Sequence, residues 1–142
     1  MSGTVETLHA TCVALEGRGL LILGPSGSGK SALAQRLIAL GALLVSDDRT
    51  RVEARDGRLW ATCPNPDLVG LIEARGVGVL RAPARGETAL DLAVDLGRDE
   101  PDRLPARRSL TILGHALPLV LRARNDHFPE ALMLYLRHGR EA

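Results

Sequence analysis

The chain has 142 residues, a formal net charge of +1 at pH 7 and two cysteines, Cys12 and Cys63. This length is enough for one domain with a buried core, and the near-neutral charge gives no reason to expect nucleic-acid or membrane binding. No apolar run has transmembrane length, the N-terminus lacks a signal-peptide layout and the cysteines lack metal-ligand spacing, so we expect a soluble cytoplasmic protein with one domain over residues 1–142.

The N-terminal third predicts a strand, loop, helix and strand. Residues 8–15 and the apolar run 20–23 predict two strands joined by a turn at "EGRG", and the second strand lacks polar alternation, which is typical of a strand covered on both faces. Residues 31–40 have apolar side chains at helical spacing with Gly41 as C-cap, and "ALLV" (42–45) predicts another buried strand. This order predicts a βαβ unit.

The rest of the chain predicts a fold with many strands for its size. We expect a hairpin over 51–61 that turns at Asp56-Gly57, and a short helix over 65–74 with Asn65 as N-cap and Pro66 as first residue. In residues 89–96, Leu90, Leu92, Val94 and Leu96 lie on one face, and Asp91 and Asp95 lie on the other. This alternation predicts a half-exposed strand. A polar loop (97–108), two strands (109–114 and 117–123) and a closing helix (129–139) complete an α/β fold.

A phosphate-binding loop is the clearest motif. "GPSGSGKS" matches G-x-x-x-x-G-K-S/T and lies between a predicted strand and a predicted helix. Its backbone N–H groups would hold phosphate, Lys30, the chain's one lysine, would neutralise the β- and γ-phosphates, and the Ser31 hydroxyl would bind Mg²⁺. The predicted nucleotide-binding residues are Gly24, Pro25, Ser26, Gly27, Ser28, Gly29, Lys30 and Ser31.

The loop alone does not identify the reaction, because guanylate kinases and ABC ATPases have similar loops. An ABC ATPase is disfavoured because the sequence has neither an LSGGQ-like signature nor an apolar strand ending in Asp-Glu. A nucleotide kinase is disfavoured because the chain is short and has no obvious arginine-rich lid.

An acidic pair follows the predicted strand beside the loop. Asp47 and Asp48 point in alternate directions if the chain is extended, so one can hold Mg²⁺ or its waters while the other accepts a proton from an attacking hydroxyl. A solvated turn or a helix cap is the alternative. His9 would lie near the mouth of the loop if its strand pairs with the next one, although a lone histidine is more often structural.

Together these motifs resemble the catalytic domain of the bifunctional HPr kinase/phosphorylase family, an α/β P-loop kinase domain of the HPr kinase and phosphoenolpyruvate carboxykinase-like type. Its members have a histidine before the loop, then the loop, an Asp-Asp pair, an E-x-R-G-x-G signature and an Asp-Arg-Leu. The corresponding residues are His9, the loop at 24–31, Asp47-Asp48, "EARGVG" at 73–78 and Asp102-Arg103-Leu104. The match covers residues 8–104, and the signature combined with the acidic pair is its most specific part.

The resemblance implies a kinase that phosphorylates a serine of HPr, the phosphocarrier of the sugar phosphotransferase system, using ATP and Mg²⁺. Asp48 would accept the serine proton and would return it in the reverse reaction. Its active-site partners would be His9, Lys30 and Arg103. The partner protein would be HPr or an HPr-like carrier, and the assembly a homo-oligomer, commonly a hexamer in this family.

The resemblance also implies metal ligands. These are Ser31 and Glu73, to which the acidic-pair argument adds Asp47. Simpler interpretations exist for three of the charged residues. Glu73 and Arg75 would form a weak ion pair at a helix end, and Arg103 would be a solvated loop charge.

Some features depart from the family pattern. We expect no separate N-terminal domain, Ala10 and Ala32 replace a usual glycine and glutamate, and the Pro-Val-x-x-Gly-Arg stretch associated with dephosphorylation has no clear counterpart. Arg122 and Arg124 occupy that region and either replace this stretch or are ordinary surface charges, of which we favour the second. The expected function is therefore an HPr kinase with weak phosphorylase activity, in a short homologue of a kind found in bacteria with a partial phosphotransferase system. The alternatives are a small-molecule P-loop kinase and a non-catalytic nucleotide-binding regulator.

Overall fold

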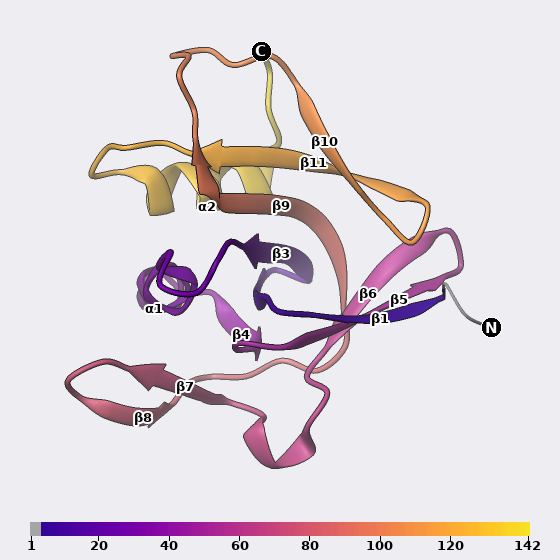
Figure 1. Ribbon diagram of the computed structural model, residues 1–142, viewed down its shortest axis with the longest axis vertical. Helices are drawn as coiled ribbons and strands as arrows, with labels where there is room; N and C mark the ends of the chain where they lie inside the picture. Colours follow the sequence, from indigo (N-terminus) through magenta and orange to yellow (C-terminus); the bar gives the residue numbers. More distant parts are fainter. Residues whose placement is uncertain (1–3) are drawn as a thin grey trace.

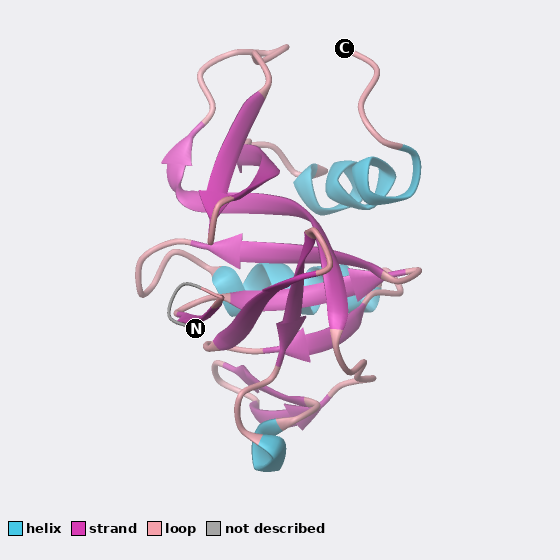
Figure 2. Cartoon of the chain, turned by 90° about the vertical axis from the view of Figure 1, so that its right-hand side faces the viewer, coloured by secondary structure: helices cyan, strands magenta, loops and turns pink. Residues whose placement is uncertain are grey.

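The computed structural model describes residues 4–142 and shows an α/β fold built on one strongly bent sheet (Figures 1 and 2). The described chain has two α-helices, α1 (Lys30–Ala39) and α2 (Phe128–His138), and a 3₁₀ helix η1 (Pro66–Leu68). The strands are β1 (Val5–Leu8), β2 (Thr11–Leu15), β3 (Arg18–Leu23), β4 (Leu43–Ser46), β5 (Thr50–Arg55), β6 (Arg58–Thr62), β7 (Leu71–Ala74), β8 (Gly78–Arg81), β9 (Thr88–Asp99), β10 (Arg108–Ile112) and β11 (His115–Arg122).

Strand β9 is the centre of the sheet. The strand order is β1-β5-β6-β9-β3-β2-β4, and β11 also pairs with β9 and brings β10 with it. Strands β3 and β11 both run parallel to β9, whereas β6 pairs antiparallel with its first residues. A Cβ on Gly19 would lie 2.7 Å from the Ala89 carbonyl oxygen, so a glycine is required where β3 begins its pairing with β9.

The two faces of the sheet are buried by different elements. Helices α1 and α2 cover one face, and their core consists of Leu20, Ile22, Leu33, Leu37, Leu92, Val94, Phe128, Leu132, Met133 and Leu136 among others. The hairpins β5–β6 and β10–β11 close the other face, around Cys12, Leu21, Val45, Val52, Leu59, Leu90, Ala93, Leu117 and Leu119. The core is almost wholly aliphatic, as the scarcity of aromatic residues requires.

The prediction of a half-exposed strand over 89–96 is wrong. Ala89 and Ala93, on the supposed polar face, are buried, and Asp91 and Asp95 are half-buried. Asp91 accepts a hydrogen bond from Arg58 at 3.1 Å. The register with β3 also shifts near the start of β9, which places Leu90 in the second core and not beside Leu92. Local alternation missed this burial because the covering hairpins are distant in sequence.

Two other predictions need correction. Residues 8–15 are not one strand, because the chain bends between β1 and β2, which pair with different partners. The helix expected over 65–74 is only η1, although the Asn65 side chain caps it by accepting the Asp67 N–H at 3.0 Å. Residues 71–74 form β7, which pairs with β8 in a separate hairpin.

The remaining predicted elements are present with shifted bounds, since β9 continues to Asp99 and β10 runs from Arg108 to Ile112. Asp56 and Gly57 have positive φ values of 54° and 74° at the β5–β6 turn, as a type I′ turn requires. The strand, loop, helix and strand unit is also present, with β2 inserted antiparallel between β3 and β4. No helix within residues 4–142 is long and apolar enough to cross a membrane.

The two cysteines differ in exposure, which gives a test of the core. Cys12 is fully buried and burial raises the pKa of its thiol far above the ordinary range, whereas Cys63 is partly exposed. We expect the native protein to release one equivalent of thionitrobenzoate from Ellman's reagent at pH 8, and the unfolded protein two. Rapid reaction of both thiols in the native protein would contradict the β2 packing described here.

Candidate active site

The phosphate-binding loop connects β3 to α1 and needs glycine at its start. Gly24 has φ +148°, and a Cβ there would lie 2.5 Å from the Ser28 hydroxyl oxygen. The Ser28 N–H donates to the Pro25 carbonyl at 3.0 Å, which closes the turn. The Ser28 hydroxyl is buried without a hydrogen-bond partner within the described chain. Such an orphan is rare in native proteins and fits a loop that binds an anion.

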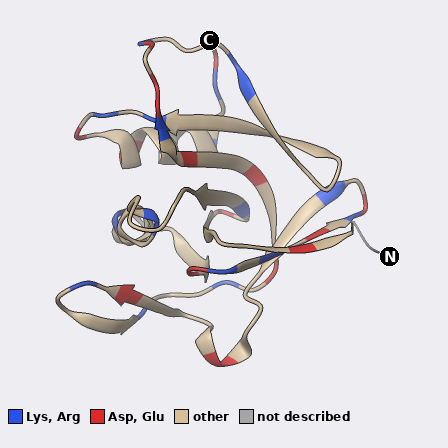
Figure 3. Ribbon diagram, in the orientation of Figure 1, with Lys and Arg blue, Asp and Glu red and all other residues tan. Residues whose placement is uncertain are grey.

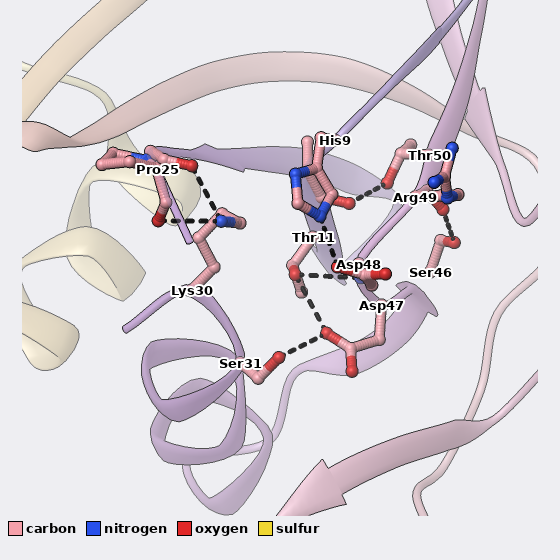
Figure 4. Close-up of polar contacts among 12 residues, drawn as sticks. His9, Thr11, Pro25, Lys30, Ser31, Ser46, Asp47, Asp48, Arg49 and Thr50 are labelled. Atoms are coloured by element: carbon pink, nitrogen blue, oxygen red, sulfur yellow. Dashed lines mark hydrogen bonds and ion pairs between the residues drawn. The ribbon is translucent and has the colours of Figure 1, made fainter. Parts of the chain in front are cut away.

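Lys30 is held inside the loop. It is 8% exposed, and its ammonium donates to the carbonyl oxygens of Gly24 at 2.8 Å and Pro25 at 3.2 Å. Figure 4 shows its side chain directed toward these carbonyls and away from the two aspartates. A phosphate group on the loop would therefore compete with two backbone carbonyls for this ammonium.

Asp47 links three elements at one end of the sheet. Its Oδ1 accepts hydrogen bonds from the Ser31 hydroxyl at 2.7 Å and the Thr11 hydroxyl at 3.0 Å (Figure 4). Ser31 belongs to α1, Thr11 begins β2, and Asp47 follows β4. Sequence analysis missed Thr11, whose only sequence signal was its place two residues after His9.

Asp48 points toward His9 instead. The His9 Nε2 lies 2.6 Å from Asp48 Oδ1, and both side chains are more than half exposed. The backbone N–H of Asp48 donates to the Thr11 hydroxyl at 3.3 Å, so this one hydroxyl contacts both members of the acidic pair. Asp48 also has φ +69°, a left-handed conformation that aspartate tolerates better than most residues. The two carboxylates thus have different partners, as predicted, although Asp48 is left-handed and the chain is not extended there. The contact of His9 with Asp48 agrees with the partnership that the family resemblance implied.

Thr11, Lys30, Ser31 and both aspartates line one cavity of about 480 Å³, which we call the acidic pocket, whereas His9 contacts Asp48 from outside this lining. It runs along the phosphate loop and the first turns of α1, and the β7–β8 hairpin forms its other wall. Its lining residues are Thr11, Ser26, Gly27, Gly29, Lys30, Ser31, Ala32, Gln35, Asp47, Asp48, Glu73 and Arg75. All the predicted metal-binding side chains, Ser31, Asp47 and Glu73, therefore face a common space.

The donor set of the acidic pocket fits Mg²⁺. It supplies hydroxyl and carboxylate oxygens, which Mg²⁺ prefers, and no thiol or imidazole among its lining residues. No group of three or more His, Cys, Asp or Glu side chains within residues 4–142 is close enough to hold a metal without further ligands. Mg²⁺ usually binds through one or two protein ligands together with substrate phosphates.

Glu73 and Arg75 are placed by a hairpin and not by a helix end. Glu73 lies on β7, and its carbonyl accepts a hydrogen bond from the Gln35 side chain of α1 at 3.0 Å. Arg75 follows in the turn to β8. Within the described residues these two side chains form no ion pair with each other, so the simpler interpretation of "EAR" as a local salt bridge is wrong.

The positions of Arg103 and Arg122 differ from those predicted from the sequence. Arg103 is exposed in the loop between β9 and β10, at the end of the molecule opposite the β7–β8 hairpin, and it does not line the acidic pocket (Figure 1). Arg122, at the end of β11, instead donates to the Ser28 carbonyl of the phosphate loop. The interpretation of Arg122 as an ordinary surface charge is therefore wrong, whereas Arg124 is exposed and pairs with Asp99 at 3.0 Å.

Comparisons with known proteins agree with this geometry. Residues 3–103 match the HPr Serine kinase C-terminal domain. The HPr kinase/phosphorylase of Streptococcus thermophilus is 45% identical over 75 residues, which cover 52% of this chain and 24% of that protein. The enzyme of the same name from Lacticaseibacillus casei is 34% identical over 105 residues, covering 69% and 33%. The chain thus spans a quarter to a third of the length of these relatives.

A solved structure is also similar. The Hpr(Ser) kinase/phosphatase from Coxiella burnetii superposes with a TM-score of 0.77 at 25% identity, over 93% of this chain and 88% of that one. The likeness extends beyond residue 103, where the family match ends, so it includes strands and a helix that the sequence motifs do not reach.

The buried ammonium provides a test of the loop. We expect Lys30→Ala to weaken binding of Mg²⁺-ATP by roughly ten- to a hundredfold, which corresponds to the loss of one hydrogen bond to a charged group. The chain has no second lysine that could take the place of Lys30. Isothermal titration calorimetry measures this, with the melting temperature as a check on folding. Lys30→Arg, which keeps the charge, is the matched variant. Unchanged affinity in Lys30→Ala would exclude this loop as the nucleotide site.

Proposed function

The chain belongs to the HPr Serine kinase C-terminal domain family, and from this membership we propose that it is an ATP- and Mg²⁺-dependent protein serine kinase. The substrate that we propose is HPr or an HPr-like phosphocarrier of the phosphotransferase system, in the cytoplasm. One observation supports the proposal above the others. A phosphate loop, a serine–aspartate contact and a histidine–aspartate contact meet around one pocket, at Ser31–Asp47 and His9–Asp48.

In the proposed reaction, the serine oxygen of the carrier forms a bond to the γ-phosphorus while the bond to the β-phosphate bridging oxygen breaks. Asp48 accepts the serine proton, and His9 holds the Asp48 carboxylate through the 2.6 Å contact. Lys30 exchanges its two carbonyl partners for phosphate oxygens. Most of the catalytic effect would come from positioning and from charge neutralisation.

Ser31, Asp47 and Glu73 are the residues that would hold Mg²⁺. When bound, the ion would neutralise charge on the phosphate oxygens. Thr11 has a positioning role in this proposal. Its hydroxyl contacts Asp47 and the Asp48 backbone, so it keeps the metal-side carboxylate and the proton-accepting carboxylate apart.

Arg103 has a place in the proposal only through a second copy of the chain. Its loop lies at the other end of the molecule from the β7–β8 wall of the acidic pocket (Figure 1). A catalytic role therefore requires that a neighbouring copy bring Arg103 to this pocket. The homo-oligomer that we infer for this chain, a hexamer, would permit that arrangement.

The central test is transfer to the carrier. We expect the protein with labelled ATP, Mg²⁺ and HPr from the same host to produce phosphoserine on HPr. Asp48→Asn should still bind ATP but lose transfer by about 10²- to 10⁴-fold, the usual effect of removing a general base. Asp47→Asn should show a defect that added Mg²⁺ partly relieves.

Other outcomes distinguish the alternatives. Transfer to a small molecule but not to HPr would identify a small-molecule kinase, and ATP binding without any transfer would identify a non-catalytic regulator. Indistinguishable behaviour of the two aspartate variants, or full activity of Asp48→Asn, would contradict the division of roles within the pair.

The reverse chemistry gives a second test. In phosphorolysis an oxygen of inorganic phosphate attacks the phosphoserine phosphorus, the bond to the serine oxygen breaks, Asp48 donates the proton to that oxygen, and pyrophosphate forms. We propose that this activity is weak here, because the Gly-Arg stretch associated with it has no clear counterpart. The assay supplies phosphoserine-HPr and millimolar phosphate without ATP. Pyrophosphate release as fast as the forward reaction would contradict the proposal that the phosphorylase activity is weak.

A further inference from the structure

Two segments at opposite ends of the molecule expose charged and apolar side chains next to each other. One is the loop between β9 and β10, where Asp102, Arg103 and Leu104 are all exposed, and we call these three residues the loop tip. The other is the β7–β8 hairpin, which forms one wall of the acidic pocket. Figure 3 shows acidic and basic positions at both ends. Exposed apolar groups with polar neighbours are typical of surfaces that bind another protein.

The hairpin region holds the largest group of exposed apolar side chains. Residues 68–80 contain more than half of the large apolar side chains that are exposed within residues 4–142. They are Leu68, Val69, Val77, Val79 and Leu80. Val79 pairs with Glu73 across the hairpin, so these two side chains lie on the same face. Because Glu73 lines the acidic pocket and Val79 is 67% exposed, this apolar surface adjoins the pocket in which we place the phosphate transfer.

Hydrogen bonds hold the loop tip in its outward position. Before the tip, Glu100 accepts two hydrogen bonds of 3.1 Å from the Arg108 guanidinium, and the Glu100 side chain is only 7% exposed. After the tip, the Pro105 carbonyl accepts a hydrogen bond from Arg140. Movement of Arg103 into the acidic pocket of its own chain would require these contacts to break. The geometry therefore favours delivery of Arg103 to a different copy of the chain.

The loop tip and the hairpin are complementary. Three carboxylates and two cations line the acidic pocket, which leaves its lining with a net negative charge that attracts the Arg103 guanidinium. Arg75, which lines the same pocket from the turn after β7, matches the Asp102 carboxylate. Within the described residues, neither Arg75 nor Arg103 forms an ion pair. Leu104, which is 75% exposed, matches the exposed Val79.

We propose that the loop tip of one copy docks on the β7–β8 hairpin of a second copy and inserts Arg103 into that copy's acidic pocket. The two surfaces are different and lie at opposite ends of the chain, so the contact is head-to-tail, and every copy supplies one arginine and receives another (Figure 1). Repeated contacts of this kind close into a ring or extend into a filament. The inference rests on the proposed function for the role of Arg103, and it adds the surface that delivers this residue.

The test disrupts each surface in turn. Leu104→Asp places a charge in the loop tip, and Val79→Asp places one on the hairpin. We expect the parent protein to sediment as an oligomer, and each variant to sediment as a smaller species that has lost most of its phosphate transfer to HPr. Leu134→Asp is the matched control, because Leu134 is 62% exposed on α2, outside both surfaces, and this variant should sediment like the parent. Melting temperatures check that all three variants are folded.

A mixture of the two disrupted variants makes the test specific. The Val79→Asp copy keeps an intact loop tip and the Leu104→Asp copy keeps an intact hairpin, so one contact can form between them. An equimolar mixture should therefore form complexes larger than either variant forms alone. It should also recover up to about half of the parent's transfer rate per copy, because only one of the two pockets receives Arg103.

The inference is overturned by a monomeric parent protein, by variants that sediment like the parent, or by a mixture that forms no larger complexes. Full transfer to HPr by the separated variants would also overturn it, because Arg103 would then act within its own chain or not at all. If the mixture forms the larger complexes while the parent transfers no phosphate to HPr, the docking surfaces stand and the proposed kinase function fails.

Discussion

Parallel pairing of β9 with β3 on one side and β11 on the other is the constraint on which the site depends. Because the three strands run in the same direction, they end at the same edge of the sheet, where ligands bind in α/β proteins. The phosphate loop follows β3, and Arg122 ends β11. The antiparallel strand β2 brings β4 into line with β3, so Asp47 and Asp48 emerge at this edge too. Strand direction therefore brings the phosphate loop and the acidic pair together, whereas Glu73 and Arg75 come from the separate β7–β8 hairpin.

Much of this arrangement could be predicted because it is local. The phosphate loop is a contiguous motif, and the acidic pair follows its helix after one short strand. The separation of the two carboxylates was predicted for an extended chain, whereas the structure achieves it with a left-handed backbone at Asp48. The contact between His9 and Asp48 spans 39 residues. The turn after the strand that follows His9 predicted only its place near the loop, and its contact with Asp48 also depends on the pairing of β2 with β4.

What could not be predicted depends on contacts between distant segments. Arg122 contacts Ser28 across 94 residues, and its sequence neighbourhood resembles an ordinary strand end. Arg103 matched a family motif, yet nothing local revealed that its loop extends away from the acidic pocket. The burial of Ala93 likewise depends on hairpins elsewhere in the chain. The alternation of residue types along a strand indicates which face each side chain occupies. It does not reveal which other segments cover those faces.

The left-handed backbone at Asp48 has a consequence for how this position tolerates change. Its φ of +69° carries a steric penalty for most side chains, and asparagine, aspartate and glycine suffer it least. A glutamate there would keep the negative charge but would have to distort the turn that presents it. Replacement of Asp48 by a longer carboxylate is therefore hindered by the main chain, whatever the role of the side chain. Drift at this position would pass most readily through asparagine or glycine, both of which lack the carboxylate.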